Sequence, residues 1–529
     1  MKLLGLVLIL SFVGFFPAFA QLQFVQRMEL KTKWEDDDFI ILNRGDGVVA
    51  FRMFSESGFS RNRSLEYFTS DVQLQTKGVK QLPVEDFYNL LGFDLDGDLL
   101  YVLFQKGEIY SGEKYMVGIN LLTDETTEIP LKAILEMDMQ EFFVINGKAI
   151  LMGNMEQRPV IQVFDTFNQH ITTIQGIYEK DLQIMQMRKA PEFNGFDVLM
   201  SRRDRFKEKS VSISSFDTEG NKIKEARIDR LGDADAEIVD GVLTPSFNYT
   251  QALMGPFSRK RKNVYQGIYF TKINEFGEYE SHLYTLKDFE NFFNYLPEKT
   301  KNRRLNSLER ALEKGKEPPI RNTLATREII AQDGTFLVYN DQFVSSSRNY
   351  PSRERMYINN FYRMSSMAGN LGGLGGYYSP LWTNPYSRPG QVSSEYRFLS
   401  AQFMLLDESG RLIWENTFSL ENTGRRNPGK FGEISFDGKN LYFLYLDEED
   451  LKLSHLKDGE VLLENETFSL ELLDESERLQ ETQSNSLNLM WWYQDYYLLS
   501  GKQKVRYMQE DGKPGTKEVY FISKIQVGD

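Results

Sequence analysis

The chain has 529 residues, of which 62 are basic and 76 acidic, so its formal net charge is −14; it holds three histidines and no cysteine. An acidic balance disfavours bulk attraction to DNA or anionic lipid, and we therefore expect no nucleic-acid partner. The absence of cysteine excludes disulfides, thiol catalysis and cysteine-ligated metal sites.

The first twenty residues have the pattern of a signal peptide. Lys2 precedes an apolar run over residues 3–16, and the small residues of 17–20 end in an A-x-A site. We expect residues 1–20 to be removed and the mature chain to begin at Gln21, exported to the periplasm or the cell surface. No later stretch is apolar for long enough to span a bilayer, so we expect no integral membrane span after cleavage.

The stretch FDLDGDLLYVLF at 93–104 carries three carboxylates, Asp94, Asp96 and Asp98, around one glycine. Alternating acids are compatible with a calcium loop or with a turn between two strands. An EF-hand loop also needs a glycine at its sixth position and an acid at its twelfth, and counting from Asp94 gives neither. We therefore expect a turn, and no metal or other cofactor.

Related stretches recur along the chain, each with an apolar residue, an Asp or Asn, a short turn that usually contains glycine, and a strand-like alternation. They lie at 163–174, 215–228, 273–286, 330–340, 405–418 and 435–446. Asp, Asn and Gly tolerate the positive φ that tight turns need, and the flanks are rich in Val, Ile, Tyr and Phe. The repeated feature is therefore a β-hairpin.

The hairpins group into units of two to four short strands. The units span roughly 37–80, 88–131, 141–178, 182–229, 236–286, 323–420, 430–472 and 487–527. About 40 to 50 residues is the period of a β-propeller blade once insertions are discounted. The chain thus resembles β-propeller repeat proteins at the level of the class, without the WD dipeptide or the kelch diglycine that would identify a particular family.

The resemblance implies an all-β fold, a β-propeller of seven or eight blades formed by residues 21–529 as a single domain. Strand-like segments at 22–31 and 517–527 would close the ring if they paired in one blade. The alternative is two smaller β domains, separated by a helical stretch near 290–316.

Two insertions depart from the repeat. At 286–322 the apolar spacing becomes helical, which predicts an inserted helical pair with Leu305, Leu308 and Leu312 on one face and basic residues on a solvated one. The second insertion, at 345–397, is long enough to suggest a functional or disordered loop, but its many aromatic residues and arginines argue against disorder. Three interpretations remain: an ordered lid on the propeller face, a ligand-binding loop, or a docking segment for another protein.

Aromatic and arginine side chains suit sugar rings, acidic glycans and protein hot spots. A run of cations at 259–262, near a second basic segment at 201–209, would form a basic rim if both loops lie on one face of the propeller; otherwise the two are scattered solvated loops. The candidate ligand-binding residues are Tyr357, Arg363, Tyr377, Tyr378, Trp382, Tyr386, Arg388, Arg259, Lys260, Arg261 and Lys262.

Signatures of catalysis are weak. His170, His282 and His455 are isolated in sequence, and 76 acids make any chosen carboxylate pair arbitrary. The sequence therefore favours an exported, non-enzymatic β-propeller that binds a protein or glycan of the cell envelope, or serves there as a scaffold. The alternative is a propeller hydrolase or lyase that acts on an anionic polysaccharide.

Overall fold

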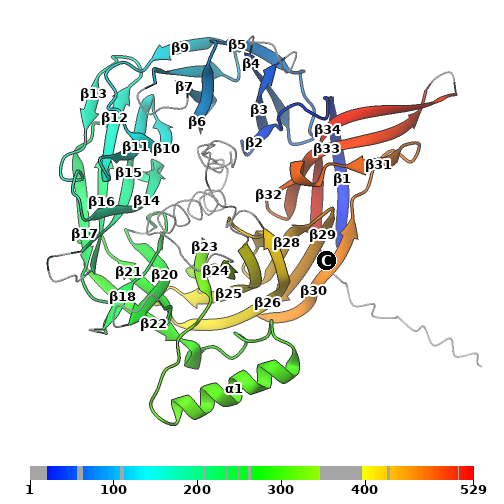
Figure 1. The fold of residues 1–529 in the computed structure, drawn as a ribbon. Helices are drawn as coiled ribbons and strands as arrows, with labels where there is room; N and C mark the ends of the chain where they lie inside the picture. The colour runs from blue at the N-terminus through cyan, green and yellow to red at the C-terminus, as the bar shows by residue number, and fades with distance from the viewer. Residues whose placement is uncertain are drawn as a thin grey trace, which may run out of the picture.

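The structure is a computed structural model of the chain. It describes residues 21–55, 63–107, 112–203, 205, 209–233, 235–247, 249–259, 264–345, 396–425, 429–509 and 512–528. Eight antiparallel sheets follow one another around a ring, which confirms the β-propeller and sets the number of blades at eight (Figure 1). Within those residues, no helix combines the length and apolar character needed to cross a bilayer.

The first four blades each contain four strands, ordered from the axis of the ring outward. They are β2 Ile40–Asn43, β3 Gly47–Ser55, β4 Arg63–Asp71 and β5 Lys80–Val84; β6 Tyr88–Asp96, β7 Leu99–Lys106, β8 Lys114–Asn120 and β9 Thr126–Pro130; β10 Asp138–Ile145, β11 Lys148–Met155, β12 Arg158–Asp165 and β13 Ile171–Thr173; β14 Leu182–Ala190, β15 Gly195–Arg203, β16 Lys209–Asp217 and β17 Lys222–Ile228.

The last four blades vary this plan. Blades 5 and 8 each divide the innermost strand into two short pieces, and the N-terminal strand lies outermost in blade 8. The strands are β18 Ala236–Ile238, β19 Val242–Leu243, β20 Gln251–Arg259, β21 Gly267–Ile273 and β22 Tyr279–Thr285; β23 Thr323–Gln332, β24 Thr335–Ser345, β25 Tyr396–Asp407 and β26 Leu412–Arg425; β27 Glu433–Phe436, β28 Asn440–Asp447, β29 Asp450–Lys457 and β30 Glu460–Ser469; β31 Arg478–Thr482, β32 Asn488–Tyr493, β33 Tyr496–Met508, β34 Pro514–Gly528 and β1 Gln21–Lys31.

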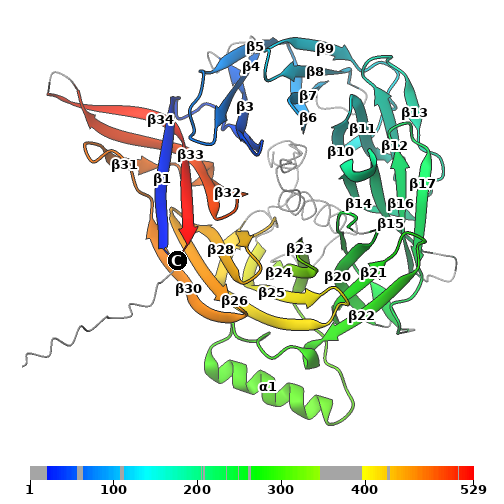
Figure 2. The ribbon, with the colours of Figure 1, turned by 180° about the vertical axis from the view of Figure 1, so that it is seen from behind.

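The ring closes through its two terminal strands, as the sequence predicts. β1 pairs with β34 in antiparallel register from Gln21 opposite Gly528 to Lys31 opposite Val519. Figure 2 shows the two strands side by side, where the blue and red ends of the chain meet. This pairing covers edges that would otherwise be exposed, and it ties the beginning of the chain to its end.

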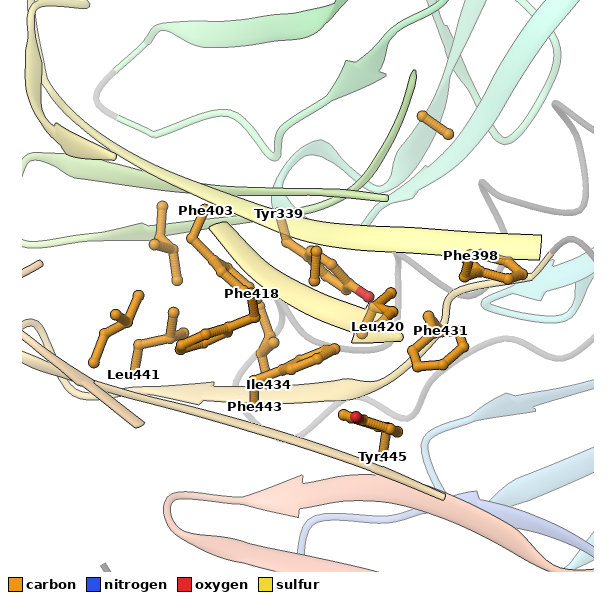
Figure 3. Packing of buried hydrophobic residues seen from close by; sticks show 14 of the residues in the cluster. Tyr339, Phe398, Phe403, Phe418, Leu420, Phe431, Ile434, Leu441, Phe443 and Tyr445 are labelled. Atoms are coloured by element: carbon orange, nitrogen blue, oxygen red, sulfur yellow. The ribbon is translucent and has the colours of Figure 1, made fainter. Parts of the chain in front are cut away.

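Aromatic side chains fill the spaces between neighbouring blades. Between blades 6 and 7, the ring of Phe443 lies 5.4 Å from that of Phe403 and 5.6 Å from that of Tyr339 (Figure 3). All three residues are fully buried. Such contacts explain the alternation in the sequence, because each strand directs every second side chain into the neighbouring interface.

The insertion between blades 5 and 6 contains one α-helix, α1 Glu298–Leu312, at the outer rim of the ring (Figure 1). Leu308 is buried, and Leu305 and Leu312 are half-buried, as the spacing predicts. The first half of the predicted helical pair is instead a 3₁₀ turn, η2 Leu286–Asp288. A second helix has little room, because Pro297 disfavours helical backbone in the residue before it.

Candidate functional site

Most of the repeated acids have a local structural role in the turns. Asp407 accepts hydrogen bonds through Oδ1 from the main-chain N–H groups of Ser409 and Arg411, both at 2.9 Å. Asp217 does the same two blades earlier, for Glu219 at 2.9 Å. These carboxylates replace main-chain partners inside tight turns, which explains why the pattern recurs.

Asp94 departs from that role, although it belongs to the same repeat. Its side chain is 2% exposed and does not cap its own turn. Oδ2 instead accepts the main-chain N–H of Val144, on β10, at 2.6 Å, and the ammonium group of Lys189, on β14, at 3.0 Å. One carboxylate of blade 2 therefore contacts blades 3 and 4 as well.

Asp96 completes a cluster that we call the lysine bridge: Asp94, Asp96 and Lys189. The Nζ atom of Lys189 lies 3.6 Å from Oδ1 of Asp96 and also donates to the main-chain oxygen of Leu95 at 3.3 Å. The side chains of Asp96 and Lys189 are 20% and 11% exposed, so both reach solvent while Asp94 does not. The third acid, Asp98, pairs with Arg44 of blade 1 at 2.8 Å.

The two carboxylates of the bridge are in different environments. Burial raises the pKa of Asp94 to about 6, against the attraction of Lys189 and the hydrogen bond from Val144. Tyr101 lies opposite Asp94 in the strand register, and burial, followed by the charges of Asp96 and Asp94, raises its pKa to about 12. A buried acid that titrates near neutrality beside a partly exposed one is an arrangement typical of acid–base sites.

The residues of the lysine bridge lie on the innermost strands of their blades. β6, β10 and β14 are the innermost strands of three successive blades, as Figures 1 and 2 show. In a four-stranded blade the innermost strand has one edge without a neighbouring strand, and the N–H of Val144 donates to Asp94 rather than to the ladder. Asp94 thus binds polar backbone that the sheet leaves unpaired.

A second charged network lies next to the lysine bridge on β14. Arg188, next to Lys189 on β14, donates through Nε to Oδ2 of Asp197 at 3.1 Å. Asp197 also accepts from Ser215 at 2.6 Å and from Gln251, of blade 5, at 2.9 Å. This buried carboxylate is saturated with donors, so we interpret it as a structural link between blades 4 and 5.

Sequence reasoning missed the lysine bridge. Asp94 and Asp96 drew attention as calcium ligands, but their partner lies 95 positions away from Asp94 in the chain. Nothing near Lys189 in the sequence indicates that partner. Among the described residues, no group of three His, Asp or Glu side chains is placed to hold a metal ion.

The predicted ligand-binding residues cannot be placed together. Arg259 ends β20, where its guanidinium contacts Glu317 and lies 2.9 Å from Asp233. The other ten lie outside the described residues, and their binding role stays a prediction: Tyr357, Arg363, Tyr377, Tyr378, Trp382, Tyr386, Arg388, Lys260, Arg261 and Lys262. The predicted signal peptide at 1–20 lies outside them too, so export stays a prediction.

The described strands give one fact about the predicted basic rim. Segments 204–208 and 260–266 each connect the second and third strands of a blade, and so does 346–395. Because strand direction alternates within each blade and repeats from blade to blade, the strand ends that flank all three segments lie on the same face of the ring.

The three histidines show no arrangement for catalysis in the part of the chain that is described. His455 is buried and stacks on Tyr442 at 4.3 Å between ring centres. His282 is half-buried on β22, and His170 is exposed in the turn before β13.

Comparison with known proteins identifies no family for the chain. No family model and no curated protein matches the chain. Among solved structures, the β-propeller domain of the trilobed protease from Pyrococcus furiosus is 10% identical, with 82% of this chain and 98% of that chain covered and a TM-score of 0.34. The acylaminoacyl peptidase from Pyrococcus horikoshii is 11% identical over 81% of this chain and 52% of that chain, with a TM-score of 0.33.

A prolyl endopeptidase is 8% identical over 92% of this chain and 53% of that chain, with a TM-score of 0.37. The chain therefore spans about half the length of the two full peptidases that it matches. At these identities the likeness concerns the fold alone, that of a β-propeller.

The comparisons also correct the predicted function. The sequence favours a non-enzymatic envelope protein that binds a protein or glycan, whereas the similar propellers named above belong to peptidases. That prediction is therefore wrong. The alternative was a hydrolase or lyase that acts on an anionic polysaccharide, and none of the similar proteins named above is described as acting on one.

Proposed function

We propose that the protein is a hydrolase whose reaction takes place at the lysine bridge. The observation that supports this proposal is the convergence of two carboxylates from blade 2 on one ammonium group from blade 4. Lys189 Nζ lies within 3.0 Å of Asp94 and 3.6 Å of Asp96. Perturbed titratable groups that gather from distant parts of a chain are typical of catalytic sites.

Each residue has a distinct role in this proposal. Asp96, which is partly exposed, acts as the general base that takes a proton from the attacking water. Lys189 stabilises the negative charge that develops on the oxygen of the scissile bond. Asp94 is a positioning residue, because it is buried and holds the ammonium group in place.

The environment of Asp94 predicts how the reaction depends on pH. Its pKa of about 6 means that the carboxyl group becomes protonated as the solution turns mildly acidic. Protonation removes one of the two charges that hold Lys189 in position. We therefore expect the acid limb of the profile of kcat/KM against pH to include a pKa near 6.

The test uses the chain from residue 21 onward and a panel of chromogenic esters, amides, glycosides and phosphate esters. For the member that is turned over, Asp96→Asn is expected to lower kcat/KM by about 10²-fold or more, the usual effect of losing a general base. The matched control is Lys148→Met, which removes a lysine that pairs with Asp165 at 2.7 Å in blade 3. The control is expected to keep full activity.

Two results would overturn the proposal. One is the absence of turnover above the buffer rate for every member of the panel. The other is full activity in the Asp96→Asn protein, or a loss matched by unfolding in circular dichroism, since either would make the lysine bridge a purely structural link between blades.

A further inference from the structure

The outer half of blade 6 buries polar side chains that have no hydrogen-bond partner among the described residues. Gln402, on β25, is 1% exposed, and neither Oε1 nor Nε2 forms a hydrogen bond within the described part of the chain. Thr417, on β26, is 3% exposed, and its hydroxyl is likewise unpaired there. Burying a polar atom without a hydrogen-bond partner costs about 1–3 kcal/mol of folding free energy. Such atoms are therefore normally paired with protein, water or a bound ion.

A carboxylate near them in the sheet is also buried with one oxygen atom unpaired among the described residues. Glu415 is 5% exposed; its Oε1 accepts the main-chain N–H of Asn291, in the insertion, while its Oε2 has no partner in the residues described. No lysine, arginine or histidine of the described chain forms an ion pair with it. Burial, with a smaller contribution from the charge of Glu290, raises the pKa of Glu415 to about 7, against hydrogen bonds from the main chain of Asn291 and Glu290.

The strand register places the three side chains on one face of the blade. Gln402 is directly opposite Thr417, and Met404 is opposite Glu415. Side chains that face each other across antiparallel strands are about 5 Å apart at Cβ, and diagonal neighbours about 7–8 Å. Gln402 and Thr417 are thus direct neighbours, and Glu415 is a diagonal neighbour of Gln402 on the same face. Together the three side chains offer a carboxylate, an amide carbonyl and a hydroxyl to a ligand held between them.

We propose that Glu415, Thr417 and Gln402 bind a monovalent cation, Na⁺ or K⁺, beneath the insertion at 286–322. Hard cations prefer such oxygen ligands, and Glu415 is the one carboxylate among the three buried side chains, so it balances a single positive charge. A divalent ion would leave a net charge buried, which is costly. The inference does not depend on the proposed hydrolase, because the site lies on the outer strands of blade 6, away from the lysine bridge.

The cation would join the insertion to the propeller. Asn291 contacts Glu415 through two groups: its main-chain N–H binds Oε1, and its side-chain amide donates to the main-chain oxygen at 3.0 Å. Asn294 donates to Asn416 at 3.1 Å. An ion at Oε2 of Glu415 would fix the carboxylate that anchors this segment, so its binding should stabilise the folded protein.

The experiment compares melting temperatures in NaCl, KCl and choline chloride at equal ionic strength, with ²³Na NMR relaxation as a direct measure of binding. The chain from residue 21 is expected to melt at a higher temperature in one of the two alkali chlorides than in choline chloride. Thr417→Val, which keeps the shape of the side chain and removes its oxygen, is expected to abolish that difference. Ser400→Ala is the matched control. The hydroxyl of Ser400 is also buried without a hydrogen-bond partner among the described residues, but Ser400 lies opposite Ser419 in the strand register, farther from Glu415.

Glu415→Gln is the second variant, and it keeps the test decisive if Thr417→Val does not fold. Loss of the alkali-specific stabilisation in either variant, with its retention in Ser400→Ala, supports the site. Equal melting temperatures in all three salts, or the same alkali effect in every variant, would overturn it and leave water as the occupant.

Discussion

Replacing Asp94 by Asn tests the electrostatics of the lysine bridge without reference to any substrate. The pKa of the carboxyl group rises from 3.8 to about 6 on folding, and burial is the largest cause. At about 1.4 kcal/mol for each pKa unit, the ionised form costs the folded state about 3 kcal/mol. Since Asp94 is 2% exposed, solvent screening reduces this figure little.

The sign follows from the direction of the shift. A carboxyl group whose pKa is raised on folding favours the folded state below its unfolded pKa of 3.8, and this contribution is lost as the pH rises through about 6. Asn resembles the protonated carboxyl at every pH. We therefore expect the stability of Asp94→Asn relative to the parent chain to increase by about 3 kcal/mol between pH 4 and pH 8.

Thermal melting by circular dichroism measures this difference. With an unfolding entropy of about 2 cal/mol/K per residue, 3 kcal/mol corresponds to about 3 °C in a chain of this size. The difference in Tm between variant and parent should thus rise by about that amount from pH 4 to pH 8. Asp98→Asn, in the same turn but 47% exposed, serves as the control for removing a carboxylate that solvent reaches.

A constant difference for Asp94→Asn across that range would refute the reasoning. A difference that falls as the pH rises would refute it more strongly, because it would mean that the attraction of Lys189 for Asp94 outweighs the cost of burial.

Three further substitutions test the packing of the ring. Phe443→Ala should cost about 3–5 kcal/mol and lower Tm by several degrees in a thermal melt, because this fully buried ring fills the interface of blades 6 and 7. Lys430→Met should cost about as much by the same measurement, since the ammonium group lies 2.6 Å from Glu328 and 2.8 Å from Glu433 and its loss leaves two acids without their cation. Gly267→Ala should abolish soluble expression, because its Cβ would overlap the main-chain oxygen of Tyr284 on β22.

These three predictions have distinct contradicting outcomes. Phe443→Ala with an unchanged Tm would mean that the interface closes over the cavity. Lys430→Met with unchanged stability would mean that Glu328 and Glu433 are neutral in the folded protein. Soluble Gly267→Ala with the parent Tm would show that β21 and β22 can separate without cost.

The sequence by itself determined the repeat, and through it the fold. Asp, Asn and Gly at regular intervals encode tight turns, and the alternation between them encodes half-buried strands, because both signals act over a few residues. The boundaries of the eight units match the blades closely, and the segment at 22–31 pairs with 517–527 as expected. The sequence also predicts the apolar face of the helix at 298–312, because helical periodicity is likewise a signal within a few residues.

Only the tertiary structure decided which of the repeated acids differ from the rest. Asp94 and Asp217 occupy equivalent positions in the pattern, yet one bridges three blades and the other caps its own turn. The difference arises because Lys189 and Val144 belong to other blades. The sequence of one strand does not indicate which side chains a neighbouring blade places beside it. The same holds for Glu415, whose burial beside Asn291 depends on how the insertion packs against blade 6. Turns and strands depend on interactions between residues close in sequence, and so the sequence predicts them. The groups that we propose to be functional come together only when the ring closes.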